Sequence, residues 1–161
     1  MEWNIEGNKV NFHGKLTETS DVKKFTEDMS KVSSNTGFQF DFSAVQFANS
    51  MGISQLMRFL QEFKGDIEYI NAPIWLVNAI NVIPQLTCGR FKTKSIQVPY
   101  YSEETNEDLT VTLEVGKDIP VKESYKGFEL QKIEKDGDTF IADIIPENYL
   151  SFISIYKNLY T

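Results

Sequence analysis

Hydrophobic and polar residues alternate with a period of two at the start of the chain. In residues 3–12, WNIEGNKVNF, apolar side chains occupy every second position on either side of Gly7-Asn8. Alternation interrupted by a Gly-Asn pair is typical of two antiparallel strands joined by a tight turn. The pattern therefore predicts a β-hairpin.

The next segments switch between helical and strand periods. Apolar residues recur at helical spacing from Val22 to Val32, with Ser20 as the expected N-cap and Asn35-Thr36-Gly37 as the break. Residues 38–42, FQFDF, alternate as a strand, and residues 53–63 then return to the i, i+3, i+4, i+7 pattern of a helix with one buried face.

A further strand and helix complete the first part of the chain. Residues 67–70, IEYI, read as a strand, and the next helix is expected to begin near Pro73 and end at Pro84. The order β-β-α-β-α-β-α predicts an α/β fold in which helices cover a mixed β-sheet. We assign this domain to residues 1–98.

The composition changes near residue 95, where the chain becomes rich in turns and acidic residues. Apolar residues alternate from Leu109 to Val115, Asp136-Gly137 marks a hairpin, and residues 146–160 have the pattern of one amphipathic helix. Residues 99–161 are therefore expected to form a β-rich α+β appendage, a hairpin and a helix that pack against the first part.

Charge and composition exclude several classes of function. A formal charge of −7 argues against nucleic-acid binding, which needs clustered cations. No apolar run approaches the roughly 20 residues of a membrane span, and the polar N-terminus is unlike a signal peptide, so we expect a cytoplasmic protein without membrane insertion. One cysteine, Cys88, and one histidine, His13, leave no thiolate-rich or two-histidine metal centre, and we expect no metal and no cofactor. We expect His13 to be structural.

The segment FDFSAVQFANSMGISQLMRFLQEF, followed by GDIEYINAPIWLVNAINVIPQL, resembles the STAS domain of anti-sigma factor antagonists. In that family a hydrophobic strand, a D-S-[ST]-G loop and an amphipathic helix occur in this order. The resemblance places Ser50 at the serine that a partner kinase phosphorylates. Asn49 stands where the family usually has aspartate, Met51 stands where it has serine or threonine, and Gly52 matches.

A phosphate on Ser50 would lie at a helix N-terminus, where backbone N–H groups favour negative charge, so its effect should fall on a bound partner. The predicted partner-binding residues are Asn49, Met51, Gly52, Ser54, Gln55 and Arg58, on the loop and on one stripe of the helix. Two simpler interpretations stay open. Ser50 or Asn49 can be the N-cap alone, and the stripe can be an ordinary solvated helix face.

A second, fainter resemblance concerns the last third of the chain. The stretches VPYYSEET, VKESYKGFEL and DIIPENYLSFI look like a small zinc ribbon that has lost its cysteines. The positions corresponding to its metal ligands are Ser102, Thr105, Glu123 and Lys126, which form no tetrahedral thiolate site. The alternative is an unrelated β-rich appendage held by packing.

No catalytic motif stands out, and we expect no enzymatic activity. The STAS resemblance implies a bacterial regulatory module that binds a protein partner, an anti-sigma factor or kinase, through the Ser50 loop. The alternative is a constitutive scaffold subunit that docks on the ATPase of an ABC-type lipid-transport complex. A hydrolase acting through acidic residues of the tail, and a small-molecule sensor, have less support in the sequence.

Overall fold

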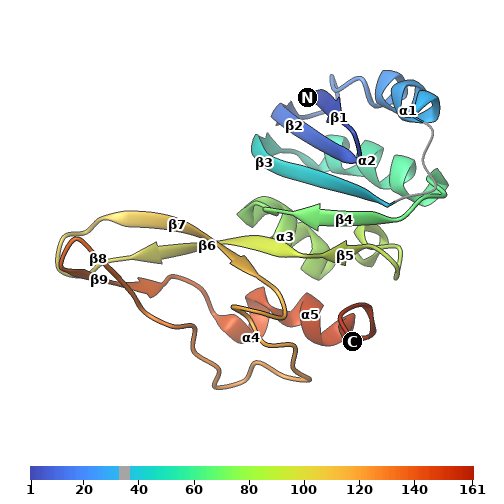
Figure 1. Cartoon of the computed structure of the whole chain (residues 1–161). Helices are drawn as coiled ribbons and strands as arrows, with labels where there is room; N and C mark the ends of the chain where they lie inside the picture. Colours follow the sequence, from blue (N-terminus) through green and yellow to red (C-terminus); the bar gives the residue numbers. More distant parts are fainter. Residues whose placement is uncertain (33–36) are drawn as a thin grey trace.

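A computed structural model describes residues 1–32 and 37–161 of the chain. It contains a mixed five-stranded sheet in the order β1-β2-β3-β4-β5 and a second, four-stranded sheet in the order β7-β6-β9-β8 (Figure 1). The predicted α/β class with a mixed sheet and helices is confirmed. The strands of the first sheet are β1 (Glu2–Glu6), β2 (Lys9–Leu16), β3 (Phe38–Ala48), β4 (Ile67–Ile70) and β5 (Lys92–Thr93).

The first two strands form the predicted antiparallel hairpin, and β2, β3, β4 and β5 then run parallel. β3 is longer than the predicted strand at 38–42, because it stays paired with β2 as far as Leu16 and Ala48. Two register shifts between the strands, at Asn11/His13 and at Gly14/Lys15 of β2, interrupt this long pairing. The extra length carries β3 directly to the start of the next helix.

Helices pack on the aromatic face of this sheet. They are α1 (Val22–Lys31), α2 (Ser50–Glu62), α3 (Ile74–Val82) and the 3₁₀ turn η1 (Pro84–Leu86). Phe25 of α1 and Phe59 of α2 pack against each other and against Phe40. Their ring centroids are 4.8–6.2 Å apart, within the range that aromatic pairs prefer. The other face of the sheet is polar and includes the ion pair between Lys9 and Asp41 at 3.2 Å.

The start of α1 differs from the prediction. The N-cap is Asp21, whose carboxylate accepts from the Lys24 N–H at 2.9 Å, and not Ser20. The Ser20 hydroxyl instead accepts from the Thr17 N–H at 2.9 Å, so it closes the loop that precedes the helix. The predicted break at Asn35-Thr36 lies outside the described residues.

The second sheet consists of antiparallel strands that extend from the edge of the first (Figure 1). They are β6 (Ser95–Tyr101), β7 (Asp108–Glu114), β8 (Ile133–Lys135) and β9 (Asp138–Ala142). β6 begins beside Ala72, after the end of β4, and continues into the second sheet, so residue 98 lies within a strand. The predicted turn at Asp136-Gly137 joins β8 to β9, with φ angles of 55° and 86°.

The C-terminal segment does not form the single amphipathic helix that its pattern predicts. It is divided into α4 (Pro146–Tyr149), α5 (Ser151–Ile155) and the 3₁₀ turn η2 (Lys157–Leu159). The break falls at Leu150, where Asn81 of α3 accepts from the N–H of Phe152 at 2.8 Å and donates to the carbonyl of Tyr149 at 3.0 Å. A tertiary contact thus replaces the local helical pattern and joins the tail to α3.

Candidate functional site

The junction between β3 and α2 is held by the side chain of Asn49. Its Oδ1 accepts from the N–H of Gly52 at 2.9 Å and caps α2, while its Nδ2 donates to the carboxylate of Glu18 at 2.6 Å. This hydrogen bond is the main reason why the pKa of Glu18 lies below its ordinary value. Aspartate at this position would supply the cap but would place a second carboxylate beside Glu18.

Gly52 allows the first turn of α2 to approach the end of β2. A Cβ atom at this position would meet the carbonyl of Leu16, with the carbonyl carbon at 2.5 Å and the nitrogen of Thr17 at 2.7 Å. Those atoms belong to the backbone and cannot rotate away. The N–H of Asn49 donates to the same Leu16 oxygen at 3.0 Å, so β2 and α2 are in direct contact here. Gly52 is itself buried and therefore shapes the junction from inside.

Two large apolar side chains at the junction are exposed to solvent. Phe47, near the end of β3, is 50% exposed and Met51, in the first turn of α2, is 58% exposed. Ser50 lies between them in the sequence and is also exposed. We call Phe47, Asn49, Ser50 and Met51 the junction surface. The sequence interpretation missed Phe47, because the predicted strand ended at residue 42 and β3 continues to Ala48.

The remaining predicted contact residues follow along α2. Ser54 and Gln55 are half-buried and Arg58 is exposed, so the stripe does not form a uniform surface. The Nε2 group of Gln55 donates to the carbonyl of Glu18 at 3.2 Å, whereas its buried Oε1 atom has no partner within the described part of the chain. Gln55 therefore reinforces the same loop that Asn49 holds.

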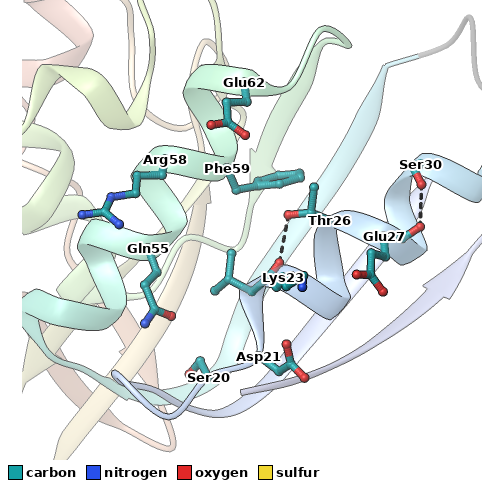
Figure 2. Close-up of a pocket in the computed structure, with 11 residues that line it drawn as sticks. Ser20, Asp21, Lys23, Thr26, Glu27, Ser30, Gln55, Arg58, Phe59 and Glu62 are labelled. Atoms are coloured by element: carbon teal, nitrogen blue, oxygen red, sulfur yellow. Dashed lines mark hydrogen bonds between the residues drawn. The ribbon is translucent and has the colours of Figure 1, made fainter.

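A groove of about 670 Å³ separates α1 from α2, and Gln55 and Arg58 belong to its lining. Figure 2 shows Phe59 pointing from α2 toward α1, whereas Arg58 extends away from α1. The hydroxyl of Thr26 donates to the carbonyl of Val22 at 2.9 Å, and that of Ser30 to the carbonyl of Glu27 at 2.7 Å. These two hydroxyls are therefore used inside α1 and do not point a free donor into the groove.

The charges around this groove have both signs. Its lining includes the carboxyl side chains of Asp21, Glu27 and Glu62 and the cationic side chains of Lys23 and Arg58. No arrangement of a nucleophile, a base and an orienting group is evident in this lining.

The four positions of the ribbon resemblance contact three different groups and do not converge on one site. The hydroxyls of Ser102 and Thr105 both donate to the carboxylate of Asp138, at 2.7 and 2.5 Å, and these bonds hold the pKa of Asp138 below its ordinary value. Glu123 pairs with a lysine of η2. The Lys126 N–H donates to a neighbouring serine hydroxyl at 3.2 Å. Ser102 and Thr105 thus join the β6–β7 loop to β9 through a carboxylate.

Two further observations concern metals and membranes. Residues 1–32 and 37–161 contain no group of three or more His, Cys, Asp or Glu side chains that could hold a metal ion. None of the helices in these residues is long and apolar enough to cross a membrane. His13 lies on the exposed side of β2, where its Nε2 atom is 3.0 Å from the carboxylate of Glu2.

Comparisons of the chain with protein-family models, with curated proteins and with solved structures found no match.

Proposed function

We propose that the chain is a non-enzymatic protein-interaction module of the anti-sigma factor antagonist type, and that a protein partner binds at the junction surface. The observation that carries the proposal is the exposure of Phe47 and Met51 on either side of an exposed serine. Exposed large apolar side chains with polar residues around them are typical of protein contact sites. The order of elements and the mixed sheet are compatible with the STAS resemblance in the sequence.

The partner that this resemblance implies is an anti-sigma factor with kinase activity. The exposed hydroxyl of Ser50 lies in the first turn of α2, where the helix dipole favours a phosphate. Glu18, held to Asn49, already places one negative charge beside this turn. A phosphate would therefore add negative charge to a surface that also exposes Phe47 and Met51. It would weaken the binding of the partner through the cost of desolvating the phosphate and through repulsion.

The proposal is tested by capture from the native cytoplasm, followed by affinity measurements with the purified partner. The baits are wild type, Ser50→Glu, Ser50→Ala and the matched control Thr110→Glu, which adds the same charge on exposed β7. We expect one partner to bind wild type, Ser50→Ala and the control, and to bind Ser50→Glu at least about tenfold more weakly. Arg58→Ala and Phe47→Ser should also weaken it.

Equal binding by wild type, Ser50→Glu, Phe47→Ser and Arg58→Ala would refute docking at this surface. Equal binding by wild type and Ser50→Glu, with loss only in Phe47→Ser, would refute the phosphorylation switch but retain the docking surface. The identity of the partner then separates the two functions. A kinase-like anti-sigma factor supports the regulatory function.

The second candidate is a constitutive scaffold subunit of an ABC-type lipid-transport complex. The favouring observation is that Asn49 binds both Glu18 and the Gly52 N–H, so that one side chain ties the start of α2 to the loop that follows β2. Met51, which has no hydroxyl group, also fits a contact that phosphorylation does not regulate. Co-purification with an ATP-binding-cassette subunit, at equal yield from wild type and Ser50→Glu, is the result expected for the scaffold.

A further inference from the structure

A second groove lies between α3 and the C-terminal segment, far along the chain from the junction surface. It has a volume of about 610 Å³. Ile74, Asn78 and Val82 of α3 form one wall, and residues 143–151 form much of the other. Figure 1 shows α3 beside α4 and α5, in agreement with the hydrogen bonds that join them. We call this feature the tail groove.

The tail groove continues into a neighbouring hollow of about 450 Å³. Ile74 and Asn78 line both. The hollow extends past Trp75 to Val45 and Gln46 of β3. The lining of the two hollows therefore runs from residues 143–151 past α3 to β3, a span that an extended chain segment can follow.

The walls of the tail groove expose large aliphatic side chains. Val82 is 75% exposed and Ile145 is 66% exposed, and both belong to the lining. The described part of the chain has five exposed large hydrophobic residues, and two of them line this groove. Covering them would remove apolar surface from water, which is the main favourable term in association.

The polar groups of the groove indicate the chemistry of its occupant. Asp143 and Glu147 are exposed in the lining, which contains no lysine, arginine or histidine. The side-chain amides of Asn78 and Gln97 form no hydrogen bond with the described residues, so each offers a donor and an acceptor to a peptide backbone. Asp143 and Glu147 are therefore complementary to positive charge, and Val82 and Ile145 to aliphatic side chains.

The walls are joined to one another by part-buried hydrogen bonds. Besides its two bonds to the backbone of the tail, Asn81 accepts from the hydroxyl of Ser151 at 2.7 Å. The hydroxyl of Tyr149 donates to the carbonyl of Gln97 at 2.6 Å, which joins α4 to β6. A groove that is already formed costs little conformational entropy when it is filled.

From these observations we propose that the tail groove binds an extended, basic segment of a partner protein in which aliphatic residues alternate with lysine or arginine. The aliphatic side chains lie against Val82 and Ile145, and the cations face Asp143 and Glu147. Asn78 and Gln97 bind the peptide backbone. The surface is distinct from the junction surface and does not depend on Ser50.

The test uses a library of random dodecapeptides displayed on phage, selected on the full chain and counter-selected on a Val82→Asn/Ile145→Asn variant. Both substituted positions are exposed, so the variant should fold as wild type does. We expect recovered sequences to be rich in Lys or Arg alternating with Val, Ile or Leu. One recovered peptide is then synthesised for calorimetry and for mapping by NMR chemical shifts.

The peptide should bind the Val82→Asn/Ile145→Asn variant at least about tenfold more weakly than wild type. Asp143→Asn/Glu147→Gln should weaken binding by about three- to tenfold, and added salt should reduce this difference. The matched control Glu104→Gln/Glu107→Gln removes the same charge from an exposed loop and should change affinity less than twofold.

Three outcomes would overturn the proposal. The first is recovery of no sequence that distinguishes wild type from the Val82/Ile145 variant. The second is a peptide whose chemical shifts map elsewhere or whose affinity falls equally in the Glu104/Glu107 control. The third is self-association of wild type, measured by sedimentation, that the Val82/Ile145 variant abolishes, because the occupant would then be a second copy of the chain.

Discussion

Replacing Gly52 by alanine should destabilise the protein, although alanine favours helices. At an ordinary exposed helix position this change stabilises by about 1 kcal/mol. Here the new Cβ would lie 2.5 Å from the carbonyl carbon of Leu16 and 2.7 Å from the nitrogen of Thr17. Since such contacts essentially never fall below 3.0 Å, α2 or the end of β2 must move by about 0.5 Å.

This displacement costs about 1–3 kcal/mol as overpacking, and it weakens the bond from the Asn49 N–H to the Leu16 carbonyl, worth about 1 kcal/mol. After the helix-propensity gain is subtracted, Gly52→Ala should lose about 2 kcal/mol of unfolding free energy. Urea denaturation followed by circular dichroism measures this loss. The matched control is Ser54→Ala, two residues further along α2, which should be neutral or stabilising by a few tenths of a kcal/mol.

A Gly52→Ala variant as stable as wild type, with an unchanged dependence of its unfolding free energy on urea, would show that the backbone contact with Leu16 does not limit this position. An equal loss of unfolding free energy in Ser54→Ala would have the same meaning, because the loss would then come from alanine in α2 and not from the contact with β2.

Two further predictions concern the last third of the chain. Asn81→Ala removes three hydrogen bonds to the tail and should lower the free energy of unfolding, measured with urea, by about 2–3 kcal/mol. Hydrogen exchange at the Phe152 amide should become faster, and unchanged exchange would contradict the role of Asn81 as a cap. Because the pKa of Asp138 is lowered in the folded chain, its contribution to stability should be complete above the unfolded value of about 3.9 and be lost as the pH falls through the lower folded value. Asp138→Asn should therefore lose less stability than wild type between pH 7 and pH 3, and equal losses would refute this account.

The first part of the chain was largely predictable because its elements carry local signals. Gly7-Asn8 supplies turn chemistry between two alternating runs, and Pro73 and Pro84 bracket α3 as predicted. Periodicity also identified α2, because a helix that packs one face on a sheet must repeat its apolar residues every three to four positions.

The differences arise where a contact from a distant element decides the local structure. Residues 146–160 have a helical pattern, yet Asn81 binds backbone groups in their middle and divides the helix. β3 extends beyond its alternating aromatics because β2 remains beside it. At the candidate site the sequence located Ser50 and Met51, but Phe47 becomes exposed only because β3 continues past the core, a length that local pattern did not predict.

Asn49 and Asn81 show why such contacts need an amide in particular. Each uses Oδ1 to accept from the N–H of a helix first turn, and Nδ2 to hold a separate segment, the Glu18 carboxylate in one case and the Tyr149 carbonyl in the other. Aspartate could accept in both places, but it has no donor for the second bond. The partners lie 31 and 68 residues away in the chain, so neither pairing has a local sequence signal. Asn49 fixes the junction surface and Asn81 fixes the tail groove, so the same side-chain chemistry provides the rigidity that both proposed binding surfaces require.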